Sequence, residues 1–574
     1  MSFYVAAYDT EAVFAWWEPT RSDAAGYDAY LSYEGEPRET FLAGARAVAE
    51  AHLGTETPAT FFIVAKLLDH CGSELRAILD HPSFDLQCHS YTHPDLIRIS
   101  ADEKTLRYEY LCTHRAQAPD HPPLWNMPTP PNILFVLTDN QRHDLLGAAN
   151  NPIIHTPHLD HLTRRGTRFT HAFATTPICA ASRASILTGL YERRHGFTFL
   201  TPPLAAACAR TSYPALLHDV GYQTGLIGKL GIESKGVGDI IDIEDTATTV
   251  PALFDLLDNY EHWGPEGYEI AQPDGSTRHL TDITGDKAID FLRACQSPFC
   301  LSISFNAPHA QDNDPRQYIW PENETALYQD TTFPEPLNSD PAYFASLPDF
   351  LRHSESRKRW SKRYDTPQKF QRSMQGLYRM VSGVDRNIGR ILAELERLDL
   401  TDNTIIIFTS DHGMFYGERG LCDCWLLHEE SLRVPLLVYD PRTAHSGLTR
   451  HEMVLNIDIA PTILDLAGIP APTTYQGRSL APLLQNQTVA WREDFLCEHH
   501  FTHPTIPKSE GLRSQDWKYF RYYEQDPLYE CLYNLQIDPN ETTNLAADPE
   551  HEDQLNLMRV RCDQLISEAQ AGSP

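Results

Sequence analysis

The chain has 574 residues, of which 41% are hydrophobic and 22% are charged, and its formal net charge is −31. Two or three domains are expected at this length, and the acidic balance excludes nucleic acids and anionic membranes as partners bound through bulk charge. A local cationic pocket is still compatible with an anionic substrate. We expect a cytoplasmic protein with free thiols, because the sequence shows no signal peptide or membrane span and its twelve cysteines have no disulfide-framework spacing.

Residues 1–115 carry three short motifs, AAYDTEA, PATFFIVAKLL and FDLQCHSYTH. These resemble the start of a polysaccharide deacetylase of the NodB type. The resemblance implies Asp9 as a base and a divalent metal, with Zn²⁺ as a candidate, on Glu11, His89 and His93. The later motifs of that family are absent. We therefore expect a partial (β/α)-barrel-like segment that is an inactive remnant or a docking module, with an active sugar N-deacetylase as the alternative.

Residues 116–131 form a proline-rich stretch that is typical of a stiff linker. The apolar run ILFVLTD follows it and begins an alternation of helical segments and apolar runs that extends past residue 400. This alternation predicts an α/β fold with a large, mostly parallel sheet flanked by helices. From about residue 491, short strands and a final amphipathic helix around 554–566 replace it. We predict an α/β domain over 132–490 and a small C-terminal subdomain with an antiparallel sheet over 491–574.

Two of the apolar runs end in similar polar residues. Asp139 and Asn140 end the first run, and Asp411 and His412 end the run TIIIFTSDHG. Ligands of open α/β sheets bind beyond the carboxyl ends of the strands, so these four side chains are candidate metal ligands. Their oxygens suit Ca²⁺ or Mg²⁺, and the imidazole extends the choice to Mn²⁺ or Zn²⁺. For each pair alone, capping of a turn or a helix is the alternative.

Cys179 has no second cysteine close by and stands four residues before Arg183, in CAASRASILTG. A phosphatase thiolate loop needs five intervening residues, whereas this stretch has three. The stretch resembles the sulfatase signature, Cys-x-(Pro or Ala)-x-Arg followed by a Leu-Thr-Gly helix. In that family a maturation enzyme oxidises the cysteine to formylglycine, whose hydrated aldehyde is the nucleophile. GYQTGLIGK, SFNAPH, FTSDHG and HEESLRVPLLVYDP continue the resemblance in family order.

The resemblance covers about 440 residues, from Pro131 almost to the C-terminus, and implies the fold of the alkaline-phosphatase superfamily. It also implies roles for the residues that match. Cys179 is the formylglycine precursor, Arg183 holds the hydrate, Lys229 binds sulfate and His309 is the general acid. The implied metal, with Ca²⁺ expected first and Mg²⁺ or Mn²⁺ as alternatives, is bound by Asp139, Asn140, Asp411 and His412.

The chain departs from the family pattern at two positions. Gly231 stands where many sulfatases have a histidine, and Cys424 stands near the place of a sulfate-binding lysine. Substitutes for these groups, and candidate substrate-binding residues in the tail, are found among His195, His428, His499, His500 and Lys508. The alternative for the tail histidines is a solvated strand end. A zinc site on Cys422, Cys424 and His428 is disfavoured, because Cys-x-Cys is the wrong spacing for most structural zinc sites.

These observations favour a sulfatase that acts on sulfated mono- or oligosaccharides and depends on a maturation enzyme as a partner. A phosphate or phosphonate ester hydrolase of the same superfamily is the alternative among enzymes. The departures at Gly231 and Cys424 motivate a third possibility, a catalytically impaired protein that binds sulfated glycans.

Overall fold

The computed structural model describes residues 130–199, 204–232, 253–260, 267–443 and 445–571, and the backbone of five strands nearer the N-terminus. The chain divides into two compact units, Met1–Pro128 and Thr129–Pro574. In the described part, no helix combines enough length with enough apolar character to span a bilayer.

In the first unit, β1 (Ser2–Ala7), β2 (Ala12–Glu18) and β3 (Tyr30–Ser32) form an antiparallel sheet in that order. β4 (Ala59–Val64) and β5 (Phe84–His89) pair in parallel. Of the predicted metal site, Asp9, Glu11 and His93 lie outside the described residues, and His89 ends β5, where the backbone alone is described. The partial barrel and its metal site stay predictions.

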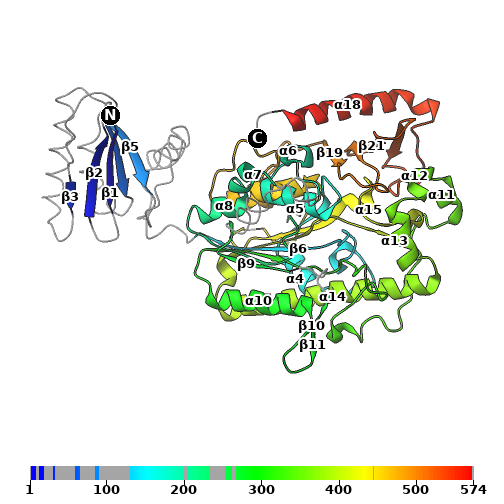
Figure 1. The fold of residues 1–574 in the computed structure, drawn as a ribbon, viewed down its shortest axis with the longest axis horizontal. Coiled ribbons are helices and arrows are strands. Elements are labelled where there is room, and N and C mark those ends of the chain that lie inside the picture. Colours follow the sequence, from blue (N-terminus) through cyan, green and yellow to red (C-terminus); the bar gives the residue numbers. More distant parts are fainter. Residues whose placement is uncertain are drawn as a thin grey trace, which may run out of the picture. The chain divides into compact units, whose positions relative to one another are not determined.

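The second unit is built on one large sheet (Figure 1) with the order β17-β7-β16-β13-β6-β12-β8-β9, and β18 also pairs with β7. Every pairing in it is parallel except those of β16, which runs antiparallel to both neighbours. In chain order the strands are β6 (Asn132–Thr138), β7 (Thr167–Phe173), β8 (Gln223–Gly228), β9 (Leu256–Asn259), β12 (Phe299–Ser304), β13 (Thr404–Ser410), β16 (Arg433–Tyr439), β17 (Leu448–Arg450) and β18 (Val454–Leu455).

Helices cover both faces of this sheet (Figure 1). One face is covered by α4 (Pro157–Arg165), α10 (Leu280–Ala294) and α14 (Pro367–Arg397), and the other by α5 (Cys179–Thr188), α7 (Ala206–Arg210), α8 (Tyr213–His218) and α16 (Ile459–Leu466). The fully buried strand β6 divides its side chains between two cores. Leu134 and Val136 pack on the α14 side, and Ile133, Phe135 and Leu137 pack on the α5 side. A continuous apolar run is therefore what this central strand requires.

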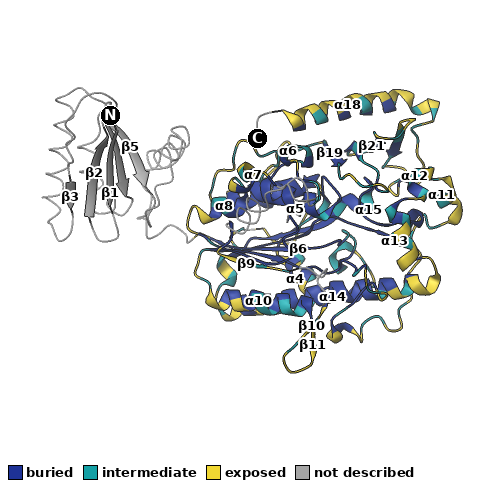
Figure 2. Ribbon diagram, in the orientation of Figure 1, coloured by how far each residue is buried: buried dark blue, intermediate teal, exposed yellow. Residues whose placement is uncertain are grey.

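The two faces differ in how deeply their helices are buried (Figure 2). Ala180–Thr188 of α5 are buried on every side, whereas α14 is amphipathic and shows polar residues outward. Pro367 begins α14, and the Thr366 hydroxyl accepts a hydrogen bond from the backbone N–H of Lys369 over 3.2 Å. This is a standard helix N-cap. Shorter helices connect these elements: α6 (Glu192–His195), α11 (Pro341–Ser346), α12 (Asp349–Arg352), α13 (Glu355–Arg363), α15 (Glu429–Leu432) and α17 (Ala481–Leu484).

The C-terminal part forms a four-stranded antiparallel sheet with one long helix. Its strands, in spatial as well as chain order, are β19 (Asp494–His499), β20 (Ser509–Ser514), β21 (Trp517–Tyr522) and β22 (Tyr529–Asn534). Helix α18 (Glu552–Gln570) packs on this sheet through Leu555, Met558 and Cys562. Short two-stranded ribbons, β10 (Glu269–Ala271) with β11 (Thr277–His279) and β14 (Phe415–Tyr416) with β15 (Cys422–Asp423), complete the unit. The predicted mostly parallel α/β sheet and C-terminal antiparallel sheet are both confirmed.

Candidate active site

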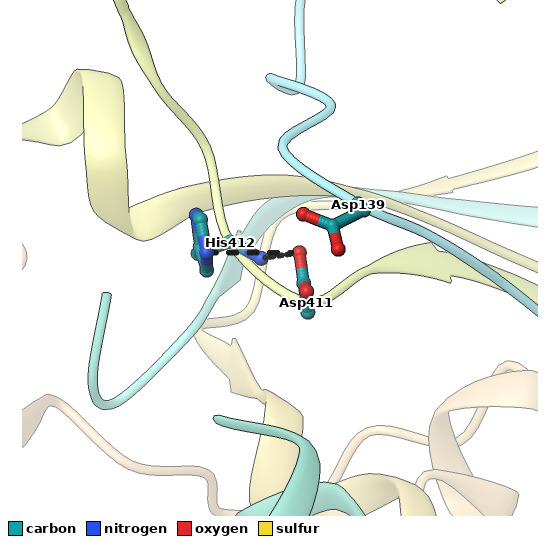
Figure 3. A group of neighbouring side chains, drawn as sticks. All are labelled: Asp139, Asp411 and His412. Carbon is teal, nitrogen blue, oxygen red and sulfur yellow. Dashed lines mark hydrogen bonds and ion pairs between the residues drawn. The ribbon is translucent and has the colours of Figure 1, made fainter. Parts of the chain in front are cut away.

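Two neighbouring strands bring the predicted metal ligands together. β6 and β13 pair in parallel with Thr138 opposite Ser410, so Asp139 and Asp411 follow side by side at the carboxyl edge of the sheet. Figure 3 shows their carboxylates toward each other with His412 beside them. One ligand atom from each of these three buried residues lies within 4.8 Å of the others. The group has the size and chemistry of a metal site.

Several buried atoms of this group have no hydrogen-bond partner among the described residues. They are Oδ1 of Asp139, Oδ1 of Asn140 and Nε2 of His412. Asn140 has a positive φ of 70°, and its backbone N–H donates to Asp411 Oδ1 over 3.1 Å. Buried polar atoms without partners are costly, and a cation that accepts these lone pairs removes the cost. Two carboxylates, an amide oxygen and an imidazole therefore fit a divalent metal.

Arg183 connects the carboxylates to two further strands. Its guanidinium donates to Asp411 Oδ2 over 3.0 Å and to Asp139 Oδ2 over 3.2 Å. It also donates to the backbone oxygen of Lys229 over 2.7 Å and to the Ser304 hydroxyl over 2.6 Å. One buried side chain thus fixes the ends of β6, β13, β8 and β12 relative to one another, which the planar fork of arginine makes possible.

Lys229, directly after β8, is the second cation of the group. Its ammonium lies 2.7 Å from Asp139 Oδ2. Burial alone raises the pKa of Asp139, but Lys229, His309 and Arg183 together hold that pKa well below its usual range. Asp139 is therefore ionised and available as a metal ligand. Asp139 and Asp411 are balanced in charge by Arg183 and Lys229.

Helix α5 places Cys179 at its N-terminus, facing this group. No side-chain hydrogen bond caps the helix at Ile178. The Ser182 hydroxyl donates to the Asp411 backbone oxygen over 2.5 Å, which ties the first turn to the end of β13. Burial lowers the pKa of the His412 imidazole, but Cys424, the carboxylate of Asp411 and a contact with Cys179 together hold that pKa above its usual range. Cys179 is half-buried and free. An uncapped helix N-terminus beside two cations favours an anion.

The side chain of Arg183 occupies the space that a histidine at position 231, found in many sulfatases, would need. Gly231 has a φ of +76°, and a β carbon there would lie 2.6 Å from Cδ of Arg183. The other departure, Cys424, is buried beside His412, and burial raises the pKa of its thiol to about 12. The disfavoured zinc set does not assemble either. Cys422 accepts a hydrogen bond from Arg363, Cys424 faces His412, and His428 bonds Glu541.

His309 lies in the loop after β12, close enough to Asp139 and Lys229 to act on both. Burial lowers the pKa of its imidazole, opposed by Asp139 and Asp312. Nδ1 lies 2.6 Å from the backbone oxygen of Ala310. This contact assigns the proton of the neutral ring to Nδ1, so Nε2 is then unprotonated. Nε2 is therefore the ring nitrogen that gains a proton when the imidazole is protonated, and the loop places this side chain close enough to Asp139 to act on it.

The tail residues divide into two groups. His499 ends β19, is fully buried, and has no described hydrogen-bond partner for either ring nitrogen. Burial, with His500, His412 and Lys508 nearby, lowers its pKa to about 3. His499 is therefore near enough to His412 and Lys508 to feel their charge, and the Lys508 ammonium itself pairs with Glu524 over 2.9 Å. His500 instead bonds Glu498 over 3.0 Å and Tyr523 over 2.9 Å, in a cluster that includes Arg193.

Three supporting residues were not among the sequence candidates. Ser304 bonds Arg183, Ser182 bonds Asp411, and Asn456 donates to the Ser182 hydroxyl over 2.9 Å. Ser182 lies inside the signature, so its presence at the site could have been found from the motif. Ser304 and Asn456 carry no local signal, because their hydrogen bonds to Arg183 and Ser182 join residues more than one hundred positions apart in the chain.

A second group of possible metal ligands, His428, Glu430 and Glu541, is filled by cations of the chain. Lys518 Nζ lies 2.7 Å from Glu541 and 2.8 Å from Glu429, and Arg419 pairs with Glu430. The pair of Lys518 with Glu429 joins the C-terminal sheet to α15, directly before β16. The group is therefore a structural network between the two parts.

Three family models match the chain. The sulfatase model matches residues 131–469, and the model of the C-terminal region of N-sulphoglucosamine sulphohydrolase matches residues 417–568. A polysaccharide deacetylase model matches residues 45–117. The first match covers more than half of the chain and includes every residue of the candidate metal group.

Several characterised proteins are similar over most of their length. An N-acetylglucosamine-6-O-sulfatase of Bacteroides thetaiotaomicron is 29% identical over 75% of this chain and 85% of its own. A choline-sulfatase of Rhizobium meliloti is 30% identical over 73% of this chain and 83% of its own. A solved structure, described as a complex with its substrate D-glucosamine-2-N,6-O-disulfate, has a TM-score of 0.65 and 26% identity, covering 77% of this chain and 99% of that one.

Proposed function

This chain belongs to the sulfatase family, enzymes that hydrolyse sulfate esters, and we propose that it removes sulfate from mono- or oligosaccharides. The observation that carries the proposal is the position of Arg183. This arginine of the signature Cys-Ala-Ala-Ser-Arg hydrogen-bonds both carboxylates of the candidate metal group. The motif and the metal group, more than 200 residues apart for Asp411, thus form one site.

The charge of the site supports an anionic substrate. Two carboxylates are balanced by Arg183 and Lys229, so a bound divalent cation gives the site a net positive charge. The N-terminus of α5 adds its partial positive charge at Cys179. A sulfate ester is therefore attracted locally, although the whole chain carries a charge of −31.

Asp139, Asn140, Asp411 and His412 would hold the metal, with Ca²⁺ expected because three of the four ligands supply oxygen. Bound there, the ion supplies charge stabilisation to a sulfate oxygen and acidifies the nucleophile. Cys179, once matured to formylglycine, would supply the two hydroxyls of the hydrated aldehyde. One would attack sulfur as the bond from sulfur to the sugar oxygen breaks, and deprotonation of the other would expel sulfate and restore the aldehyde.

The chain's own side chains carry the remaining steps. Lys229 and the α5 amides orient the sulfate group, and Arg183 keeps the metal carboxylates and the first turn of α5 in register. His309 protonates the leaving sugar oxygen, as a general acid. His499 and Lys508 contact the sugar or its sulfate from the C-terminal sheet, where they take the place of the family groups that Gly231 and Cys424 replace.

A sugar substrate is supported by the relatives. One similar protein is named for sulfate removal from N-acetylglucosamine, and a similar structure is described with a sulfated glucosamine as its substrate. We therefore propose a 6-O-sulfated amino sugar as the first substrate to test.

The test is sulfate release from N-acetylglucosamine 6-sulfate by protein produced with a formylglycine-generating maturation enzyme. We expect turnover that is lost in Cys179→Ala and kept in Cys295→Ala, which removes another half-buried thiol. Faster hydrolysis of a phosphate or phosphonate monoester of the same sugar would favour the ester-hydrolase alternative. Binding of the sulfated sugar with no turnover by matured protein would favour a glycan-binding protein.

A further inference from the structure

A basic cavity lies along the outer strands of the main sheet, lined by different residues from the candidate active site. Its volume is about 220 Å³, and β7, β16 and the loop after β6 form its wall. Its polar lining consists of His143, Asn150, Arg168, Thr170 and Arg433, and no carboxylate is among its described lining residues. Two arginines without an acid are unexpected in a chain that carries 78 acidic and 47 basic residues.

Arg168 projects from β7 and is half-buried. Its guanidinium makes no hydrogen bond or ion pair with any side chain or backbone group in the described ranges of the chain. Burial lowers the pKa of Arg168, and no neighbouring acid opposes that shift. A half-buried cation without a counter-charge is destabilising unless a ligand supplies one.

Arg433 begins β16 and faces the same cavity. Its Nε and Nη2 donate to the backbone oxygen of Thr170, and its Nη1 has no partner among the described residues. The two acids that act electrostatically on Arg433, Asp144 and Glu429, each form an ion pair with another cation. Asp144 is bound by Arg142 over 2.7 and 2.8 Å, and Glu429 pairs with Lys518 over 2.8 Å. Neither acid forms an ion pair or hydrogen bond with Arg168 or Arg433.

We propose that this cavity is a second oxyanion site, which binds a sulfate group between Arg168 and Arg433. The guanidinium fork suits the oxygens of sulfate, and the volume admits one such group with its sugar or with water. The ligand is either free sulfate or a sulfate group on a longer glycan. His143 follows the metal loop, and its backbone N–H donates to the Arg433 oxygen over 3.3 Å, so the cavity and the metal group share one loop.

The direct test is a crystal of the full chain with selenate, the selenium analogue of sulfate. We expect an anomalous peak within hydrogen-bond distance of Arg168 and Arg433, in addition to any peak at Cys179. The cavity peak should be lost in Arg168→Gln. It should be kept in the control Arg164→Gln, which removes the same charge from an exposed arginine on α4. A peak at Cys179 with none in the cavity of the wild-type protein would overturn the proposal.

Calorimetry separates the two sources of the ligand. If a glycan is the ligand, a 6-O-sulfated heparin-type tetrasaccharide should bind Arg168→Gln about tenfold more weakly than Arg164→Gln. If free sulfate is the ligand, the tetrasaccharide should bind both variants equally and one of two sites for inorganic sulfate should vanish in Arg168→Gln. Equal binding of both ligands by both variants would refute a second site, independently of any sulfatase activity.

Discussion

The guanidinium of Arg183 donates from Nε to Oδ2 of Asp411 over 3.0 Å, inside a site where both side chains are almost fully buried. The contact joins a residue of the sulfatase signature to a residue at the end of β13, 228 positions along the chain. Arg183 also donates hydrogen bonds to Asp139, Lys229 and Ser304, so more elements of the site meet at this residue than at any other described residue.

Replacing Arg183 by lysine should impair catalysis more than folding. Lysine keeps the charge but cannot bond Asp139, Asp411 and Ser304 at once. We expect kcat/KM to fall by about 100-fold, since a displacement of about 1 Å in a catalytic group has that effect. Steady-state kinetics with thermal unfolding would measure both. Arg183→Ala should instead cost about 3–5 kcal/mol of stability, because it leaves two buried carboxylates short of a counter-charge. Wild-type activity in Arg183→Lys would contradict this role.

Gly231→Ala tests whether the close contact between Gly231 and the side chain of Arg183 is needed for activity. The added β carbon would lie 2.6 Å from Arg183 Cδ, so the guanidinium must move. We expect at least a tenfold loss of kcat with a lower melting temperature. Gly468→Ala is the matched control, because Gly468 has a φ of +77° and nothing within 4 Å of its added carbon. Backbone strain is then common to both variants, and equal activity in the two would show that contact with Arg183 is unimportant.

Chelation should destabilise the protein reversibly. The partnerless Oδ1 atoms of Asp139 and Asn140 and Nε2 of His412 gain a partner when a cation binds. A ligand at 100 times its Kd stabilises the folded state by about 2.7 kcal/mol. EDTA should therefore lower the melting temperature, and added Ca²⁺ should restore it. Asp139→Asn should blunt both responses. A wild-type melting temperature that is unchanged by EDTA and Ca²⁺ would exclude a metal site at these residues.

His499→Gln should weaken substrate use and leave the fold intact. His499 is fully buried near His412 and Lys508, with both ring nitrogens lacking described partners, so its packing contributes little hydrogen bonding to stability. We expect kcat/KM to fall roughly tenfold, the size of one lost charge-assisted contact. His445→Gln, at an exposed position, is the control and should match the wild type. Weaker product inhibition by sulfate in His499→Gln would place the imidazole at the sulfate group.

Glu192 predicts a specific pH dependence of stability. Glu192 begins α6 and is buried, and burial raises its pKa from 4.5 to about 7. The folded state therefore binds this proton more tightly than the unfolded state, and the free energy of unfolding should fall as pH rises from 4.5 through 7. Each unit of pKa difference is worth about 1.4 kcal/mol.

Denaturant unfolding from pH 5 to pH 8 measures this effect. Glu192→Gln removes the titration, so the free energy of unfolding of this variant should rise relative to that of the wild type between pH 5 and pH 8. Glu322→Gln, at an exposed carboxyl, should keep the wild-type pH profile. Parallel profiles for the wild type and Glu192→Gln would contradict the raised pKa.

The sequence predicted those parts of the structure that depend on local patterns. The buried run before Asp139 and the run before Asp411 were expected as strands of a mostly parallel sheet, and the C-terminal strands and helix as a separate antiparallel layer. The helix that begins at Cys179 also follows from its motif. Each of these elements has its own periodicity or turn residues, which is why they are predictable.

The contacts between distant elements were not predictable. Nothing near Ser304 in the sequence signals its bond to Arg183, and nothing near Gly231 signals that Arg183 occupies the space of a side chain there. His499 and His500 are adjacent and look equivalent in the sequence. Alternation along β19 and the turn after it bury His499 within electrostatic reach of His412 and direct His500 to Glu498. Tertiary packing decides these differences.

The mass of the tryptic peptide Phe169–Arg183 tests the central claim, that Cys179 is the precursor of a formylglycine nucleophile. The full chain would be produced with and without a formylglycine-generating maturation enzyme. We predict that maturation removes one sulfur and two hydrogens from the peptide and adds one oxygen, and that sulfate release appears only in the converted protein. A Cys179 that stays a thiol beside a competent maturation enzyme, or a sulfatase activity that is independent of conversion, would contradict the mechanism.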